Sequence, residues 1–333
     1  MRTTRRQLLT GALSASALGG LAGCTTPAPD IPEPSPGKQA LTIGLTYIPN
    51  VQFSPFYVAV SSGLFADQRL DVTLRHHGAQ EDAFGALLAG QEDIVFASGD
   101  EAVVASATGA TVATFGTGFQ QFPGILLAAA DSGIATVEDL RGRTIGIPGH
   151  FGSTYYTVLA ALHLAGIAED EVKLQDIGYT QVSALSTGRV DAVAGYSNNE
   201  TVQFSTIGFN IVQLPVQDPA EPTLVGPGLV TVPASLDIDV MERVNAAVLE
   251  AEKRILADPG LAIAATKAEV PTLSDPEQEK TARAVLEATS KLWLREDGRP
   301  SLDVDVDAFH RMGEFLAEVG IITAPPANTT IAV

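Results

Sequence analysis

Aromatic and amide side chains gather in the loop that follows the first predicted strand, at residues 41–45. Tyr47, Phe53 and Tyr57 could stack on both faces of a flat ring, and each such contact is worth about 0.5–1.5 kcal/mol beyond burial. Asn50 can both donate and accept hydrogen bonds, as the edge of a heterocycle requires. Ligands of open α/β sheets bind at the carboxyl ends of strands, so this loop is a candidate binding site.

Two further loops of the first half also follow predicted strands. Asp100 and Glu101 come after the apolar run at 94–97 and begin a helix, where backbone N–H groups point outward. Asp100 is equally suited to capping that helix, so both roles stay open. Gln120 and Phe122 follow the next strand, and we expect them to face the same cleft.

The second half of the chain offers a matching pair of loops. One opens a helix after a Gly-rich stretch and could present N–H and hydroxyl groups to a ligand, although an ordinary capped helix start explains it equally well. Its candidate residues are Ser153, Thr154 and Tyr155. The other follows a buried strand, and its candidates are Tyr196, Asn199 and Glu200. Glu200 could accept hydrogen bonds from a ring amine, and Asn199 is an equal candidate.

Metal binding and catalysis find little support in the sequence. His76 and His77 are adjacent on a predicted strand and therefore point to opposite faces, and a third ligand at normal spacing is missing. The few histidines show no triad signature beside a nucleophile elbow. We therefore expect no metal, no cofactor and no catalytic residue, and a binding protein instead of an enzyme.

The elements that must position these loops alternate between apolar strands and helices, which is typical of an α/β fold. A helix, a glycine, a polar step and an apolar strand recur twice. The two copies are ALLAGQEDIVFAS from Ala86 and ALSTGRVDAVAGY from Ala184. This internal repeat predicts two similar α/β lobes that face each other. The tail is predicted to be helical at 240–257, 277–295 and 306–319, with Trp293 in its core.

The first 23 residues are typical of an export signal, with arginines at 2, 5 and 6 and an apolar stretch from Leu8. Residues 4–9 resemble a twin-arginine signal, and general secretion is the other route. Leu21 to Cys24 resembles a bacterial lipobox, which implies acylation of Cys24, the only cysteine in the chain. A Pro-rich tether follows, over residues 24–40, so we expect a membrane-anchored protein on the extracytoplasmic face.

The charge balance is acidic, with 20 Lys and Arg against 39 Asp and Glu and a formal net charge of −19. Nucleic acids and anionic lipid headgroups both require basic patches. The composition therefore argues against nucleic acid as a partner, and we expect a monomer.

A family resemblance is carried by the segment YIPNVQFSPFYVA, which runs from Tyr47 to Ala59. Gly63-Leu64-Phe65 before an RLDV strand extends it, as do residues 137–147 and 188–194. From Leu41 to Leu214 the chain resembles the NMT1/THI5-like family, which includes solute-binding proteins of ABC importers.

The resemblance implies a type II periplasmic binding protein fold, with two α/β lobes, a ligand cleft and a C-terminal helical segment. Lobe 1 would comprise residues 41–128 and 228–333, and lobe 2 residues 129–227. The partners implied are a small heterocyclic ligand and the transmembrane subunit of an ABC permease.

The ligand implied by the resemblance is a flat heterocycle, either a flavin such as riboflavin or a thiamine-type pyrimidine precursor. Two alternatives remain. Related receptors bind small sulfonate- or nitrate-like anions, but the candidate loops contain no Lys or Arg. Pyrimidine synthases share the family, but they use Cys and His, and Cys24 is the last cysteine of this chain.

Overall fold

Two five-stranded sheets organise the chain in the computed structural model, which describes residues 37–78, 81–217 and 223–333. The export signal, the lipobox with Cys24 and most of the Pro-rich tether lie outside these ranges. The first sheet has the strand order β2-β1-β3-β10-β4. Its strands are β1 (Gln39–Leu45), β2 (Leu70–His76), β3 (Ile94–Ser98), β4 (Ala113–Thr117) and β10 (Pro227–Thr231).

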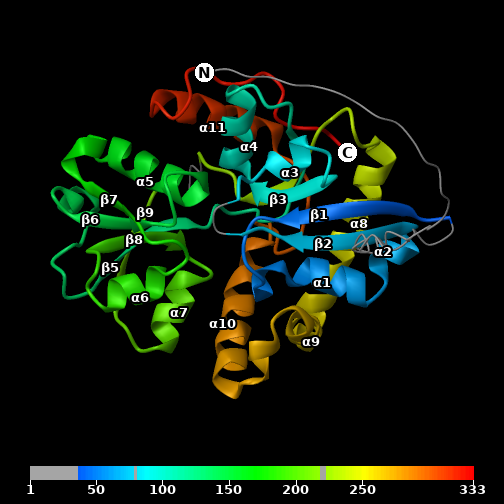
Figure 1. Cartoon of the computed structure of the whole chain (residues 1–333), viewed down its shortest axis with the longest axis horizontal. Coiled ribbons are helices and arrows are strands. Elements are labelled where there is room, and N and C mark those ends of the chain that lie inside the picture. The colour runs from blue at the N-terminus through cyan, green and yellow to red at the C-terminus, as the bar shows by residue number, and fades with distance from the viewer. Residues whose placement is uncertain (1–36, 79–80, 218–222) are drawn as a thin grey trace, which may run out of the picture. The chain divides into compact units, whose positions relative to one another are not determined.

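The second sheet repeats this order as β7-β6-β8-β5-β9 (Figure 1). Its strands are β5 (Gly124–Ala129), β6 (Thr144–Ile147), β7 (Lys173–Asp176), β8 (Ala192–Tyr196) and β9 (Ile211–Pro215). In each sheet four strands run in the same direction, and one antiparallel strand, β10 or β5, is inserted between the third and the fourth of them. The two copies found in the sequence end in β3 and β8, which hold equivalent places, so the predicted pair of lobes is confirmed.

The lobe boundary needs a correction. The sequence placed residues up to 128 in lobe 1, but β5 pairs with β8 and β9 of the second sheet. The chain therefore crosses between Thr117 and Gly124. It returns before Pro227, which already pairs with Ser98, one residue earlier than expected. The apolar run of β5 fits either sheet, and only its antiparallel pairing assigns it to the second.

Short helices follow the strands of both lobes. In lobe 1 these are η1 (Val51–Phe53), α1 (Ser54–Ser61), α2 (Leu64–Asp67), α3 (Gly85–Leu88) and α4 (Gly99–Ala107). In lobe 2 they are η2 (Val137–Leu140), α5 (Gly152–Leu164), η3 (Glu169–Glu171), α6 (Gln181–Ser186) and α7 (Glu200–Thr206). Pro55 lies in the first turn of α1, where a backbone N–H has no partner within the helix. The N–H that proline lacks therefore costs the helix no hydrogen bond. Gly63, at φ 73°, separates α1 from α2.

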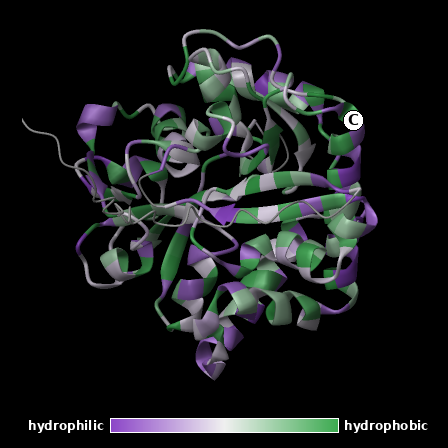
Figure 2. Ribbon diagram, turned by 45° about the vertical axis from the view of Figure 1, so that its right-hand side comes forward, coloured by the Kyte–Doolittle hydropathy of each residue, from purple (hydrophilic) through white to green (hydrophobic). Residues whose placement is uncertain are grey.

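The helical tail is confirmed, with one addition. It comprises α8 (Ile238–Ala257), α9 (Pro259–Glu269), η4 (Pro271–Ser274), α10 (Pro276–Leu292) and α11 (Val306–Glu318). The prediction from the sequence did not include α9, which starts at Pro259 directly after the end of α8. Trp293 is fully buried, as predicted. Figure 2 shows hydrophobic and hydrophilic residues alternating around the helices, as expected of helices that cover a core.

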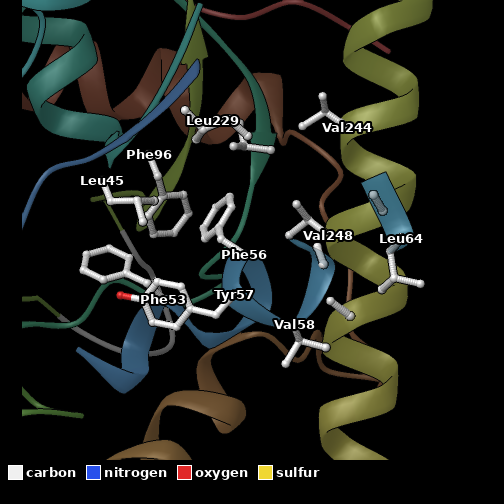
Figure 3. Close-up of a cluster of buried hydrophobic side chains, with 14 of the residues drawn as sticks. Leu45, Phe53, Phe56, Tyr57, Val58, Leu64, Phe96, Leu229, Val244 and Val248 are labelled. Carbon is white, nitrogen blue, oxygen red and sulfur yellow. The ribbon is translucent and has the colours of Figure 1, made fainter. Parts of the chain in front are cut away.

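The main core of lobe 1 lies where α1 and α2 pack against α8. Figure 3 shows Phe56, Tyr57 and Phe96 gathered there, with Val244 and Val248 of α8 beside them. This packing fixes the loop after β1, because α1 begins directly at its end. Among the described helices, none is both long and apolar enough to span a bilayer.

Candidate functional site

A pocket lies at the carboxyl ends of the strands, between the two sheets, and contains about 950 Å³ of empty space including the solvent at its mouth. Its walls come from the loops after β1, β3, β4, β6, β7 and β8. The lining residues are Thr46, Tyr47, Gln52, Phe53, Glu81, Ala83, Phe96, Ser98, Glu101, Phe119, Pro148, Phe151, Gly152, Ser153, Thr154, Tyr179, Gln181, Tyr196, Asn199, Glu200 and Pro227.

Aromatic rings form much of the wall. Tyr47 of lobe 1 and Tyr179 of lobe 2 lie edge to face, with their ring centroids 4.5 Å apart. Behind them, the ring centroid of Phe96 lies 6.2 Å from that of Phe53 and 5.9 Å from that of Phe119. These rings lie on both sides of the cleft and could enclose a planar ligand by stacking and edge contacts.

The charged groups on the pocket wall are carboxyls. Glu81, Glu101 and Glu200 line it, and among the described residues no Lys or Arg does. Burial raises the pKa of Glu200, whose oxygens accept hydrogen bonds from the Tyr196 backbone N–H and the Asn199 amide. Glu200 is therefore already bonded within the protein. The pocket favours uncharged or cationic ligands that carry hydrogen-bond donors.

Asp100 and Glu101 lie at the start of α4, where Ser98 and Glu101 form a capping box. Burial raises the pKa of Asp100 to about 6 and that of Glu101 to about 7, the latter helped by the charge of Asp100. The Ser153 hydroxyl, at the start of α5 in the other lobe, donates to the Asp100 carboxylate at 2.9 Å. Asp100 therefore links the two lobes directly.

A second polar link between the lobes is buried under the pocket. The side-chain amide nitrogen of Asn198 donates to Gln52 Oε1 at 2.7 Å and to Thr289 Oγ1 at 2.8 Å. Gln52 belongs to η1, Asn198 follows β8, and Thr289 belongs to α10. The tail helix α10 thus takes part in the junction between the lobes.

Eight of the fourteen residues predicted for the site line this pocket. They are Tyr47, Phe53, Glu101, Ser153, Thr154, Tyr196, Asn199 and Glu200. They come from both halves of the chain, so the rule that selects the carboxyl ends of strands brought together loops far apart in sequence.

Three predicted residues of the first half have structural roles beside the pocket. Asn50 caps η1 by accepting from the Gln52 N–H. Tyr57 is buried in the core, and its hydroxyl pairs with His76 Nε2 at 2.9 Å. Asp100 is fully buried beneath the lining, where its carboxylate accepts from the Ser153 hydroxyl and the Glu101 N–H, and Ser98 is the N-cap of α4 in its place.

The other three predicted residues also lie away from the lining. Gln120 donates its amide to the carbonyls of Thr117 and Ser301, which ties the loop after β4 to the tail. Phe122 packs into the core of lobe 2. The Tyr155 hydroxyl reaches Glu169 on the outer side of α5.

Several lining residues were missed by the sequence reading. Tyr179 follows β7, so the same strand-end rule would have selected it had that strand been included. Phe96 and Phe119 lie in or next to apolar strands, where an aromatic residue is expected to be core. Phe151 is 40% exposed at the rim, and no pattern in the sequence marked it.

His76 and His77 have separate partners, in keeping with opposite faces of β2. His76 Nδ1 contacts the Tyr47 carbonyl at 2.9 Å, and burial lowers the pKa of its ring. His77 Nε2 lies 2.9 Å from Glu92, which also pairs with Arg75. Within the residues that the structure describes, no group of three His, Cys, Asp or Glu side chains could hold a metal ion.

The chain is similar in sequence to several known proteins. A family model described as NMT1/THI5 like matches residues 50–262. The riboflavin-binding protein RibY of Chloroflexus aurantiacus is 37% identical over 206 residues, which is 61% of this chain and 58% of RibY. A 4-amino-5-hydroxymethyl-2-methylpyrimidine phosphate synthase of Legionella pneumophila is 26% identical over 166 residues, covering 50% and 52% of the two chains. The chain thus spans little more than half the length of these relatives.

Solved structures agree on the fold. The alkanesulfonate-binding protein SsuA of Xanthomonas axonopodis pv. citri, bound to MOPS, superposes with a TM-score of 0.68 at 17% identity. The superposition covers 90% of this chain and all of that one. It supports the two-lobed periplasmic binding protein architecture predicted from the sequence.

Proposed function

Because the chain belongs to the NMT1/THI5-like family, we propose that it is an extracytoplasmic solute-binding lipoprotein of an ABC importer, with a flavin of the riboflavin type as its ligand. The observation that carries the proposal is the contact of Tyr47 with Tyr179 across an acid-lined pocket. Rings from both lobes meet where a planar molecule would be enclosed. The similarity to RibY, over 206 residues, supports the ligand class.

Charge separates this ligand from the small anions bound by other proteins with this fold. A sulfonate or nitrate ion would approach Glu81, Glu101 and Glu200, and each ionised carboxylate opposes it. A flavin ring is uncharged and offers imide N–H and carbonyl groups. Glu101 and Gln181 can meet those groups with acceptors and donors.

A thiamine-type pyrimidine is the second candidate within the same ligand class. Its amino group suits the carboxyls, but a single ring can contact fewer of the aromatic side chains on the pocket wall than the fused rings of a flavin. Synthase chemistry is less well supported. The only cysteine is Cys24, far from the pocket loops in the sequence, and the pocket wall consists of aromatic, amide, hydroxyl and carboxyl side chains.

The mechanism follows from the two lobes. A ligand that contacts both Tyr47 and Tyr179 is held by both lobes and therefore stabilises the closed form over an open one. The closed receptor then docks on the permease. Lipidation of Cys24 and the Pro-rich tether would hold it at the membrane as a monomer. We propose residues 39–117 and 227–333 as lobe 1 and residues 124–216 as lobe 2.

Titration of the purified protein with riboflavin tests the proposal. Stacking on tyrosine should quench flavin fluorescence, with saturation at one ligand per chain and micromolar or tighter affinity. Parallel titrations with aminopyrimidine, formylaminopyrimidine and an alkanesulfonate distinguish a flavin from a pyrimidine or an anion as the ligand. If neither the flavin nor the pyrimidines bind, the proposed class is wrong. Tight binding of the sulfonate alone would support the anion alternative.

A further inference from the structure

A second cavity opens beside the first and contains about 1080 Å³ of empty space, solvent at its mouth included. It lies between α3 and α4 of lobe 1 and the start of α5 in lobe 2. The two cavities share five lining residues, namely Glu81, Ala83, Glu101, Phe151 and Gly152. The two cavities are therefore neighbours, and a long ligand held against the aromatic rings of the first could extend past these shared residues toward the second.

The second cavity differs in chemistry from the first. Carboxyls and a phenol lie along its polar side, from Glu81, Asp82, Glu101 and Tyr156. Its remaining wall is aliphatic and aromatic, with Phe84, Leu88, Val104 and Ala105. Burial raises the pKa of Tyr156, and the nearby charges of Glu101, Asp100 and Asp82 raise it further.

The acids differ in how far they are neutralised. Glu81 is paired with Arg75, whose guanidinium also bonds Glu92. Asp82 uses Oδ1 to accept from the Phe84 N–H at the start of α3. No ion pair of Asp82 is found among the described residues. Asp82 is exposed at this cavity and, unlike Glu81, has no cationic partner within the described part of the chain.

We propose that the second cavity holds the hydroxylated arm of the ligand, and that its carboxylates exclude the phosphorylated form of the same compound. The inference rests on the proposed flavin-binding function and specifies the substrate further. Hydroxyl groups of a polyol arm donate to carboxylates, and such charge-assisted bonds are the stronger kind. A phosphate at the end of that arm would bring two negative charges into the same field.

Three flavins that differ only in the arm provide the test. Riboflavin carries the polyol arm, lumiflavin carries a methyl group in its place, and flavin mononucleotide carries the arm with a terminal phosphate. We expect riboflavin to bind at least tenfold more tightly than either of the others. The difference in affinity between riboflavin and the mononucleotide should decrease with added salt, since screening weakens charge repulsion.

The variant Asp82→Asn isolates the charge, because the amide oxygen can still accept from the Phe84 N–H. It should reduce the ratio of the dissociation constant for the mononucleotide to that for riboflavin about three- to tenfold. Glu287→Gln is the matched control, since Glu287 pairs with Lys291 on α10 and lines neither cavity, and it should leave the ratio as it is.

The outcomes separate the two proposals. If riboflavin itself fails to bind, the proposed function and this inference fall together. If riboflavin binds and the mononucleotide binds as tightly, only the inference is overturned. Equal affinity for riboflavin and lumiflavin would likewise refute a role of the second cavity in holding the arm.

Discussion

Tyr47 and Tyr179 meet edge to face, 4.5 Å apart between ring centroids, although they follow β1 and β7 in different sheets. Burial raises the pKa of both phenols, so both are neutral at physiological pH. The pair closes the cleft through a contact that needs no charge. A planar ligand would have to lie against these rings or separate them, so they are the first residues to test.

Substituting Tyr179→Ala should weaken riboflavin binding about tenfold or more. The change removes one aromatic wall, and a stacked contact together with its burial is worth roughly 1–3 kcal/mol. Fluorescence titration measures the loss. Tyr155→Ala is the control, because Tyr155 lies on the outer side of α5 and bonds Glu169. Equal losses in both variants would count against Tyr179 as a ligand contact.

Substituting Asn198→Ala should destabilise the junction between the lobes. Asn198 donates to Gln52 and Thr289 in a buried position, and its removal leaves both acceptors without that donor. An unsatisfied buried polar group costs about 1–3 kcal/mol. Thermal unfolding should show the loss, and small-angle scattering should show a larger ligand-free particle. Asn210→Ala, at an exposed position, should change neither measurement.

Stability should fall as the pH rises from about 5 to 8. The pKa of Asp100 is raised to about 6 and that of Glu101 to about 7, mainly by burial. In this range these two carboxyls bind more protons in the folded protein than in the unfolded chain, so each step up in pH weakens their contribution to stability, and this outweighs the opposite effect of the half-buried His76. The contribution is complete below the ordinary carboxyl pKa and is lost as the pH passes the folded values.

Asp100→Asn isolates one of these groups. It should reduce the loss of unfolding free energy between pH 5 and 8 by roughly 1–2 kcal/mol, since one pKa unit corresponds to about 1.4 kcal/mol. Some pH dependence should remain, because the pKa of Glu200 and of Glu252 is also raised by burial. Urea unfolding at several pH values measures the slope. An unchanged slope would show that Asp100 does not titrate in this range.

Cys24→Ser should release the protein from the membrane. The proposed lipobox would place Cys24 at the new N-terminus, and without its thiol no acyl chain could be attached. Fractionation of expressing cells should move the protein from the membrane to the soluble exported fraction, and mass spectrometry should show loss of the acyl mass. If the wild-type protein is already soluble and unacylated, the lipoprotein proposal is wrong.

The sequence predicts where the strands lie better than it predicts which strands pair with each other. The apolar run 94–97 and its repeat at 190–196 could be recognised because buried strands need only local apolar residues. β5 is equally apolar, but its sheet is decided by pairing with β8 and β9, which lie far along the chain. The lobe boundary was therefore misplaced by about the length of this strand.

The site was predictable in its loops but not in the direction of each side chain. Tyr57 and Tyr47 are both aromatic residues near the end of β1, yet Tyr57 turns into the core because α1 begins at Ser54 and packs on α8. Phe96 shows the converse, since it is a buried strand residue whose ring reaches the pocket. Such differences depend on tertiary packing that no local pattern records.

Gly152 gives a prediction that separates backbone strain from contact with the site. It begins α5 at φ 75°, and a Cβ there would lie 2.9 Å from Glu101 Oε1. Gly178 has φ 58°, but a Cβ at that position would meet nothing within 4 Å. Alanine at either position bears the cost of a left-handed conformation, about 1–2 kcal/mol, so both variants should unfold at lower temperature.

Only Gly152→Ala should also weaken riboflavin binding, because Glu101 must move away from the pocket wall that it shares with the second cavity. We expect at least a threefold rise in the dissociation constant for Gly152→Ala and little change for Gly178→Ala, measured at a temperature where both variants are folded. Equal binding by the two variants would mean that the position of Glu101 does not matter to the ligand. A larger loss in Gly178→Ala would instead direct attention to the loop that carries Tyr179.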